Sequence, residues 1–417
     1  MPLSSMPPAS RHTRWPLLAC LTLALHCAAA GQATLELPKT GLEPSELAVI
    51  VNEDDPLSVR IAEYYQQRRG IPAENVLRVR FPPKSANLPR ATFKAIREAV
   101  WSRSGPNIQA YALAWTLPYR VDCMSITSAF ALGFDEAYCS AKSCAATQPS
   151  GYFNSASHAP FTDHHIRPAM LLAGQDFEAV KRLIDRGVAS DRSYPDHTGY
   201  LLNTSDKNRS VRAVFFDPTV KALGGAFRLQ KLDADSIKDK QDVLFYFTGA
   251  VKVDNLASLG FVAGAMADHL TSAGGALDGN GQMSALRWLE AGATGSYGAV
   301  VEPCNHLQKF PVPAVAIWHY AEGDSLIEAY WKSVAWPGEG VFIGEPLARP
   351  FAPRLTAVGK DKASLEIFSP TAKNLYLEAS PSPIGPFRRE ATYPLNPGLN
   401  RLEIRIPKPE LLYRIGF

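Results

Sequence analysis

Three residue types that take part in covalent catalysis follow one apolar run, in the segment SYGAVVEPCNHLQKFP at positions 296–311. Glu302, Cys304 and His306 lie close together there. A cysteine thiolate with a histidine base is a nucleophile for hydrolysis, and a carboxylate can orient that base. His269 is a second candidate base. The same Cys304 can instead form a disulfide, which would remove the nucleophile.

The N-terminal segment 1–30 has the layout of a secretory signal peptide. Two arginines precede the apolar run WPLLACLTLALHC, and an Ala-Ala-Ala cleavage site ends at Ala30. A lipoprotein signal at Cys27 is the competing interpretation, but His26 stands where such a signal has a small residue. No later stretch reaches the ~18 apolar residues of a membrane-spanning helix. We therefore expect export to the periplasm or the extracellular space, with no membrane attachment after cleavage.

Four cysteines remain after the predicted cleavage, namely Cys123, Cys139, Cys144 and Cys304. An even number of cysteines in an exported protein predicts disulfides, although four cysteines allow three pairings. The segment CSAKSC favours a local bridge between Cys139 and Cys144, which would leave Cys123 to pair with Cys304. This interpretation favours a structural role for Cys304 over a catalytic thiol.

Short apolar runs alternate with amphipathic helical patterns from about residue 45 to 345. One helix is predicted over 56–70, with Asp55 as its N-cap, and the run 46–52 before it reads as a buried strand. Further strands are predicted at NVLRVRF, IQAYALAWTL, GYLLNTS, DVLFYFTG and GSYGAVV. This alternation predicts an α/β fold with a mostly parallel sheet flanked by helices.

The sequence predicts two domains after the signal peptide. Residues 31–350 form the α/β domain, in which the long polar stretch of about 123–168 fits the strand and helix pattern worst. Connections of this length are usually lids or binding loops. Residues 351–417 alternate apolar and polar side chains with a period of two, which predicts a small antiparallel β domain.

Charged residues follow several of the predicted strands. Loops after parallel strands share one edge of a sheet, where ligands usually bind. Arg120, Arg209, Glu302 and Lys309 lie in such loops, and we expect them to form a ligand-binding rim. Ordinary surface ion pairing is the alternative, especially for Arg209 in the segment TSDKNRSVR.

Several function classes lack their sequence signals. The net charge of +3 and the absence of a dense basic run argue against nucleic-acid binding. No glycine-rich phosphate-binding motif follows a strand, so we expect no nucleotide cofactor. The segment SHAPFTDHH gathers His158, Asp163, His164 and His165, but its spacing matches no zinc motif, so we expect a solvated loop without a metal. Likewise, Asp55 in NEDDP is better explained as a helix cap than as a cation ligand.

Four segments resemble an uncharacterised family of exported bacterial proteins found in species with exosortase protein-sorting systems. They are PYRVDCMSITSAFALGFD, RPAMLLAG, GYLLNTSDKNRSVRA and GSYGAVVEPCNHLQKFP. More distantly, the order of QMSALRWLEAG, the Gly-Ala strand, IEAYWKSV, VFIGEP and a terminal β domain is similar to that of the gingipain-type caspase-like cysteine peptidases. This resemblance implies a caspase-haemoglobinase-like fold, with a catalytic His-Gly ending one core strand and a catalytic cysteine ending the next.

The chain departs from the peptidase pattern at both of these positions. Thr248-Gly249 ends the strand DVLFYFTG, and Thr271 and Ser272 stand where the cysteine is expected. A threonine cannot serve as the base for a thiolate, so the resemblance implies an inactive peptidase site. Ser272 near His269 is a possible serine nucleophile, but it lacks the G-x-S-x-G elbow.

We therefore expect an exported binding or accessory protein of the cell envelope, with an unknown protein or peptide as its ligand. The resemblance to the exosortase-associated family implies a link to extracytoplasmic protein sorting. The alternative is a hydrolase with a relocated centre. That centre would consist of Cys304 and Glu302, with His306 or His269 as the base.

Overall fold

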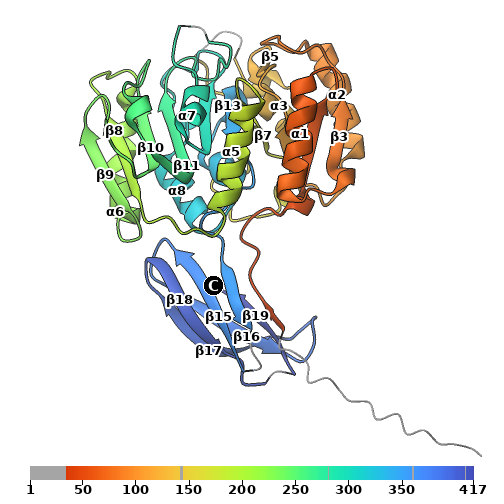
Figure 1. The fold of residues 1–417 in the computed structure, drawn as a ribbon, viewed down its shortest axis with the longest axis vertical. Helices are drawn as coiled ribbons and strands as arrows, with labels where there is room; N and C mark the ends of the chain where they lie inside the picture. Colours follow the sequence, from red (N-terminus) through yellow and green to blue (C-terminus); the bar gives the residue numbers. More distant parts are fainter. Residues whose placement is uncertain (1–33, 141–143, 280, 359–360, 409) are drawn as a thin grey trace, which may run out of the picture.

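The chain folds into a large α/β body and a smaller β domain (Figure 1). This computed structural model describes residues 34–140, 144–279, 281–358, 361–408 and 410–417. The predicted signal peptide therefore lies outside the described residues. Within those ranges, no helix is both long enough and apolar enough to cross a membrane.

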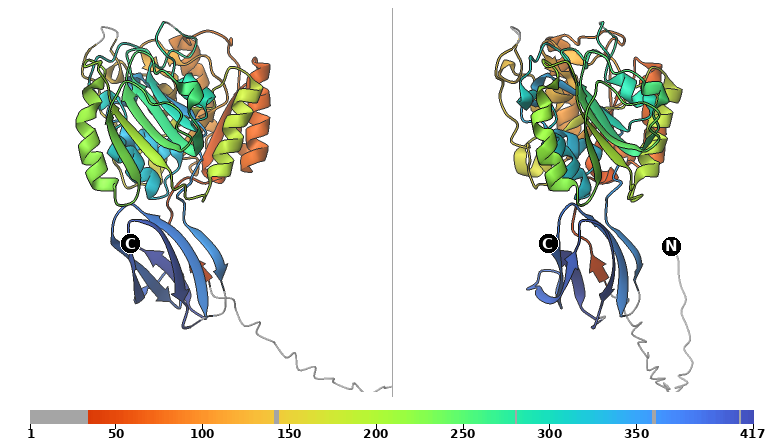
Figure 2. Two further views of the ribbon diagram at one scale, coloured as in Figure 1. Left: turned by 60° about the vertical axis from the view of Figure 1, so that its left-hand side comes forward. Right: turned by 90° about the vertical axis from the view of Figure 1, so that its left-hand side faces the viewer.

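Ten strands of the described chain form the central sheet of the large body (Figures 1 and 2). Their order across the sheet is β3-β2-β4-β7-β13-β12-β11-β10-β8-β9. The strands are β2 (Leu47–Asn52), β3 (Val76–Val79), β4 (Ala110–Leu113), β7 (Ala169–Leu171), β8 (Thr198–Asn203), β9 (Arg228–Asp233), β10 (Val243–Gly249), β11 (Phe261–Leu270), β12 (Gly295–Ala299) and β13 (Gly340–Gly344). Parallel pairing joins β3, β2, β4 and β7, and also β9, β8, β10, β11 and β12, whereas β12 and β13 pair antiparallel. The predicted mostly parallel sheet is confirmed.

Helices cover both faces of this sheet. They are α1 (Pro56–Arg69), α2 (Arg90–Arg103), α3 (Ile126–Leu132), α4 (Pro160–His164), α5 (Phe177–Ser190), α6 (Phe216–Leu223), α7 (Leu286–Ala291), α8 (Pro313–Ala321) and α9 (Leu326–Ser333). Leu47, Val49 and Val51 of β2 belong to a core cluster with α1, α8 and α9, whereas Ala48 and Ile50 belong to one with α2 and α3. Strands buried on both faces explain the continuous apolar runs in the sequence.

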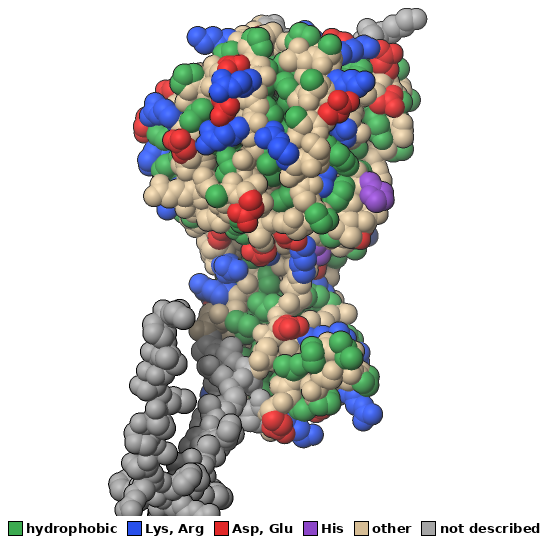
Figure 3. Space-filling model, turned by 90° about the vertical axis from the view of Figure 1, so that its right-hand side faces the viewer, with side chains coloured by type: hydrophobic (Ala, Val, Ile, Leu, Met, Phe, Trp, Pro, Cys, Tyr) green, Lys and Arg blue, Asp and Glu red, His purple; other side chains and the backbone are tan. Residues whose placement is uncertain are grey.

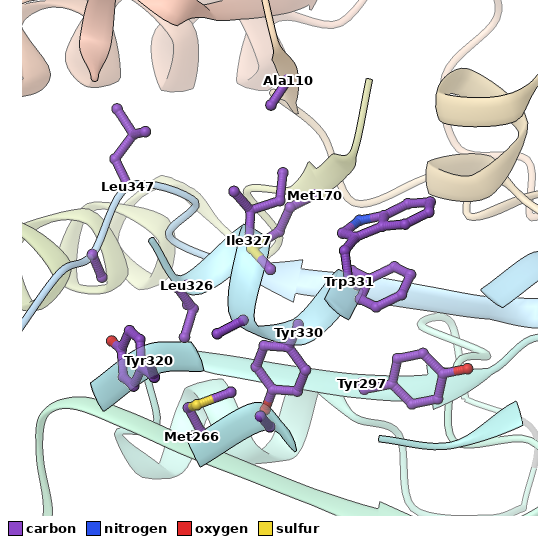
Figure 4. Packing of buried hydrophobic residues seen from close by; sticks show 14 of the residues in the cluster. Ala110, Met170, Met266, Tyr297, Tyr320, Leu326, Ile327, Tyr330, Trp331 and Leu347 are labelled. Carbon is purple, nitrogen blue, oxygen red and sulfur yellow. The ribbon is translucent and has the colours of Figure 1, made fainter. Parts of the chain in front are cut away.

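Helix α9 is buried along its whole length and connects the two halves of the sheet. In Figure 4, Ile327 lies beside Met170 of β7, and Leu326 lies toward Met266 of β11. The N-terminal Ser325 of this helix forms a capping box with Glu328. Its charged residues Glu328 and Lys332 are buried as well, and Lys332 is paired inside the protein with Asp324 at 2.6 Å.

The start and the end of α1 follow from local chemistry, as predicted. The Asp55 carboxylate accepts a hydrogen bond from the backbone N–H of Leu57 at 3.0 Å, and Pro56 occupies the first helical position. Gly70 ends the helix with a positive φ of 65°, a conformation that glycine adopts without strain. Asp55 therefore acts as a helix cap.

The stretch of about 123–168 differs from the predicted polar loop. A short hairpin of β5 (Arg120–Val121) and β6 (Met124–Ser125) begins just before this stretch and ends inside it. Helix α3, a 3-10 turn (Glu136–Tyr138) and α4 follow. Helix α3 is buried from Ile126 to Ala131. Its polar residues are satisfied inside the core; for example, the Ser128 hydroxyl donates to the carbonyl of Pro337 at 2.7 Å. This internal pairing lets a serine- and threonine-rich segment be part of the core.

The smaller domain consists of two sheets that enclose a core of their own. The strands are β14 (Arg354–Val358), β15 (Lys362–Ser369), β16 (Lys373–Ser380), β17 (Arg388–Leu395), β18 (Gly398–Arg405) and β19 (Leu412–Gly416). The N-terminal strand β1 (Thr34–Glu36) pairs in parallel with β19. The start of the range 31–350 therefore contributes to the smaller domain, which differs from the predicted boundary. Leu35 and Leu37 pack on this core, so hydrophobic burial explains the difference.

Aromatic packing joins the smaller domain to the large body. Phe227, next to α6, lies with its ring centroid 5.4 Å from that of Phe351 and 5.0 Å from that of Phe368. Lys373 also forms an ion pair with Glu322 at 2.7 Å. On the face of the molecule shown in Figure 3, basic and acidic side chains are interspersed.

Candidate functional site

The first position of the expected peptidase dyad lies at the end of β10 and carries a threonine. Thr248 is paired in register with His269 of β11. Its side chain is buried, and its hydroxyl has no hydrogen-bond partner among the described residues. The next residue, Gly249, lies so close to the backbone that a Cβ atom there would collide with the carbonyl of Arg209. The end of β10 is thus closely packed and offers no acid or base.

The His269 ring is engaged on both sides, so it cannot act as a catalytic base. The indole N–H of Trp288 donates to Nδ1 at 2.9 Å. Nε2 therefore carries the ring proton, which it donates to the carbonyl of Met283 at 3.0 Å. Burial lowers the pKa of His269 to about 4. The prediction of His269 as a base for a nucleophile is wrong because the ring is a buried, neutral part of the core.

The second dyad position, directly after β11, is closed by a network of polar side chains. Arg209 donates from Nε to the Thr271 hydroxyl at 3.1 Å, and that hydroxyl donates to Gln282 at 2.8 Å. Arg209 also pairs with Asp206 at 2.9 Å. Ser272 is partly exposed beside this network, and no base among the described residues contacts its hydroxyl. The arrangement does not activate a serine or a threonine.

A buried ion pair between Arg212 and Asp268 lies next to the ends of β10 and β11. Nη1 of Arg212 lies 2.5 Å from Oδ1 of Asp268, and both side chains are 1% exposed. Arg212 also donates from Nη2 to the carbonyl of Thr248 at 2.8 Å. Burial raises the pKa of Asp268 to about 6, although the neighbouring guanidinium opposes this rise. The pair holds the two strand ends together.

All four predicted cysteines form disulfides, but their pairing differs from the favoured one. Cys123 is bonded to Cys139, with Cα atoms 5.6 Å apart, and Cys144 is bonded to Cys304, with Cα atoms 5.1 Å apart. Helix α3 and the 3-10 turn after it reverse the chain, so that Cys139 lies next to Cys123. Cys144 then pairs with Cys304 in the loop after β12. The favoured Cys123–Cys304 and Cys139–Cys144 bridges are therefore wrong.

The relocated catalytic centre at Cys304 is also wrong, because its sulfur is bonded to Cys144 and is not a thiolate. The other members of that centre stabilise the loop. A carboxylate oxygen of Glu302 accepts the backbone N–H of Cys304 at 2.8 Å. His306 donates from Nε2 to the carbonyl of Cys144 at 3.1 Å.

A pocket of about 500 Å³ lies between the loops that follow β3, β4 and β12. The disulfide of Cys123 is part of its wall. The disulfide of Cys304 holds the loop that carries Glu302, which lines the pocket two residues earlier in the chain. We call it the disulfide-framed pocket. Its polar lining is Asn87, Arg90, Arg120, Asp122, Ser140 and Glu302.

The structure brings together two of the four residues expected to form a ligand-binding rim. Arg120 and Glu302 both line the disulfide-framed pocket. Arg209 does not line it, because its side chain is engaged with Asp206 and Thr271. Lys309 is only 1% exposed and pairs with Glu339 at 2.7 Å, so its assignment to a ligand rim is wrong. Sequence analysis missed Asn87 and Arg90, because the proline-rich segment around them signals a loop and nothing more specific.

His158 does not contact the other polar residues of its segment that were grouped with it in the sequence. It lies instead against Asp324 and Glu328, two buried acids at the start of α9. The Asp163 side chain bonds Ser157, the His164 ring bonds Ser155, and His165 ends α4. The His158 Nδ1 atom instead lies 2.9 Å from Oδ1 of Asp324.

The group of His158, Asp324 and Glu328 places its potential ligand atoms within 4.8 Å of one another, a spacing that a cation can bridge. Lys332, however, already lies 2.6 Å from Asp324. Burial lowers the pKa of His158, but hydrogen bonds to the two acids outweigh it and raise the pKa to about 9. The charges of His158 and Lys332 thus face the two carboxylates, and His319 also contacts Asp324 through Nδ1 at 3.1 Å, which makes the group an internal ion cluster.

The charge state of His158 predicts a pH dependence of stability. Its folded-state pKa of about 9 lies above the ordinary histidine pKa of 6.5, so its protonated form stabilises the fold fully below pH 6.5. This stabilisation is lost as the pH rises through 9, by up to about 3 kcal/mol. Denaturant unfolding of the wild type and of His158→Gln should show a free-energy difference that shrinks over this pH window. His165→Asn, at an exposed histidine nearby in the sequence, is the control. If the free energies of unfolding of His158→Gln and the wild type differ by the same amount at every pH, the raised pKa of His158 is wrong.

Comparison with known proteins adds one distant similarity. No protein-family model and no curated protein matches the sequence. A solved structure described as "Structure of Protease" is similar over 87% of this chain and 97% of that chain, with 9% sequence identity and a TM-score of 0.43. A similarity this low does not bear on the activity of the chain.

Proposed function

We propose that the protein is an exported binding protein of the cell envelope, without peptidase activity, whose ligand occupies the disulfide-framed pocket. The observation that carries this proposal is the contrast between two parts of the large body. The expected catalytic positions are packed and engaged, whereas the pocket holds charged side chains in a rigid frame.

Three features support the absence of peptidase chemistry. Thr248 replaces the histidine that the resemblance implies, and the His269 beside it is neutral with both ring nitrogens engaged. Among the described residues no base contacts Ser272, and Cys304 is not a free thiol. Nucleophilic catalysis needs a nucleophile and a base within hydrogen-bond reach, and no such pair is present among the described residues at these positions.

Two features support the pocket as a binding site. It lies beyond strand ends of an α/β sheet, where ligands of such folds usually bind. The bridges Cys123–Cys139 and Cys144–Cys304 fix its walls before any ligand arrives. Fixed walls reduce the conformational entropy lost on binding, which favours affinity.

The order of elements supports descent from a caspase-like peptidase. Helix α7, strand β12, helices α8 and α9, strand β13 and the Gly344–Pro346 turn follow one another before the β domain. We further propose that the protein is accessory to extracytoplasmic protein sorting, with a protein or peptide as its ligand. Two disulfides suit an oxidising compartment, either the periplasm or the extracellular space.

A single experiment tests both parts of this proposal. The mature chain from residue 31, kept oxidised and immobilised, is incubated with a degenerate library of short peptides. We expect mass spectrometry to find retained peptides that are intact, and retention to fall at least tenfold in Arg120→Gln. Cleavage that disappears in Ser272→Ala would contradict the absence of peptidase activity. Equal retention by wild type and Arg120→Gln, or no retention, would contradict the pocket assignment.

A further inference from the structure

Arg120 is a cation of the disulfide-framed pocket that has no ion-pair partner among the residues the structure describes. Its side chain lines the pocket and makes no hydrogen bond or ion pair within the described part of the chain. Its Nε atom is buried and has no hydrogen-bond partner among these described residues. A partly buried guanidinium without an acceptor is unfavourable, and a carboxylate can satisfy it through two parallel hydrogen bonds.

Glu302 is an anion that lines the same pocket. One of its oxygens accepts the backbone N–H of Cys304, and its side chain is exposed. It forms no ion pair with any cation in the described ranges, Arg120 included. Such a carboxylate retains acceptor capacity for an ammonium group, which has three N–H donors.

The other charged side chains of the pocket are already satisfied. Arg90 pairs with Asp122 and also with Glu136, the latter at 2.7 Å. These pairs leave Arg120 and Glu302 as the two lining charges without a partner of opposite sign in the described ranges. The pocket thus offers one positive and one negative contact that do not neutralise each other.

We propose that the ligand is a small zwitterion, with a carboxylate that Arg120 binds and an ammonium group that Glu302 binds. The volume of about 500 Å³ is suited to a molecule of about the size of a dipeptide, since pockets for small ligands span ~300–1,000 Å³. This inference rests on the proposed function, to which it adds the ligand class. Arg120 lies in β5, three residues before Cys123, and Glu302 lies two residues before Cys304. Two charges held in place by separate disulfides would select for the spacing between the two ends of the ligand.

Three dipeptide probes separate the two contacts by isothermal titration calorimetry on the oxidised mature chain. Alanyl-alanine has both charges, N-acetyl-alanyl-alanine has only the carboxylate, and alanyl-alanine amide has only the ammonium group. We expect alanyl-alanine to bind about tenfold or more tightly than either blocked probe. Each charge-assisted contact should contribute at least a factor of about ten to the affinity, and each blocked probe lacks one of the two contacts.

Arg120→Gln and Glu302→Gln should each weaken the binding of a different pair of probes. Arg120→Gln should weaken the two carboxylate-bearing probes about tenfold and leave the amide unchanged, which also shows that the variant is folded. Glu302→Gln should weaken the two ammonium-bearing probes and leave the acetylated one unchanged. Arg80→Gln, an exposed arginine paired with Glu53 and Asp54, and Glu403→Gln in the small domain are matched controls that should change nothing.

The outcomes distinguish this inference from the proposed function. If N-acetyl-alanyl-alanine binds as tightly as alanyl-alanine, the pocket is an anion site and the zwitterion is wrong, while the binding function stands. If no dipeptide probe binds but library peptides are retained through Arg120, the ligand class is again wrong. If neither the probes nor the library peptides bind, the binding function itself fails.

Discussion

Replacing Cys144 and Cys304 together by alanine will lower the free energy of unfolding by about 5 kcal/mol, according to the chain-entropy description of disulfides. The bridge joins residues 160 positions apart, so its loss releases a very long loop in the unfolded chain. The Cys123–Cys139 bridge spans only 16 positions, and its loss should lower the free energy by about 3 kcal/mol in the same description. Denaturant unfolding of the mature chain measures both changes.

Alanine is the appropriate replacement because Cys123 and Cys139 are buried, and a serine hydroxyl there would be left without a partner. Each double variant is thus the matched control for the other. A larger loss for the short bridge than for the long one would contradict the entropic explanation. The Cys144 and Cys304 variant should also bind alanyl-alanine more weakly, since the loop that carries Glu302 is then no longer held.

Elements whose determinants lie within a few residues of each other could be predicted from the sequence. The cap Asp55, the proline after it and Gly70 fix both ends of α1 through contacts within one turn of the chain. Buried parallel strands such as β2 and β10 were recognisable because both of their faces are apolar. Helix α3 was not, since its buried serines and threonines look like a loop until the backbone carbonyls that accept their hydrogen bonds are known.

Pairings between distant segments could not be predicted. The partner of Cys304 depends on the path of the chain through α3, which has no signal in the cysteine spacing. The acids beside His158 lie at the start of α9, far along the sequence. Arg120 and Glu302 were recognised because each follows a predicted strand, but the same rule also selected Lys309, whose side chain turns into the core toward Glu339. Position after a strand indicates the edge of the sheet and does not indicate exposure.

The second large effect concerns the ion pair beneath the expected catalytic positions. Arg212→Met should destabilise the fold by roughly 3–5 kcal/mol, because it leaves Asp268 as a buried carboxylate without a counter-charge. Both side chains are 1% exposed, and Arg212 also binds the carbonyl of Thr248. Lys362→Met, which removes an exposed pair with Glu403, is the control and should change stability by less than about 1 kcal/mol.

A double variant distinguishes the cost of the unpaired Asp268 carboxylate from the cost of the packing that Arg212→Met removes. Adding Asp268→Asn to Arg212→Met removes the uncompensated charge, so the double variant should be more stable than Arg212→Met alone. If the two substitutions instead add, the pair contributes nothing beyond packing.

The pH dependence gives an independent check on the same pair. The pKa of Asp268 is already raised to about 6, and without Arg212, which lowers it, it should rise further. A carboxyl whose folded pKa exceeds its unfolded value of 3.8 stabilises the fold at low pH, and this contribution is lost as the pH rises through the folded pKa. The deficit of Arg212→Met should therefore be smaller at pH 5 than at pH 8. A deficit that is equal at both pH values would mean that Asp268 is not the source of the cost, and that the strand ends depend on Arg212 through its bond to the Thr248 carbonyl alone.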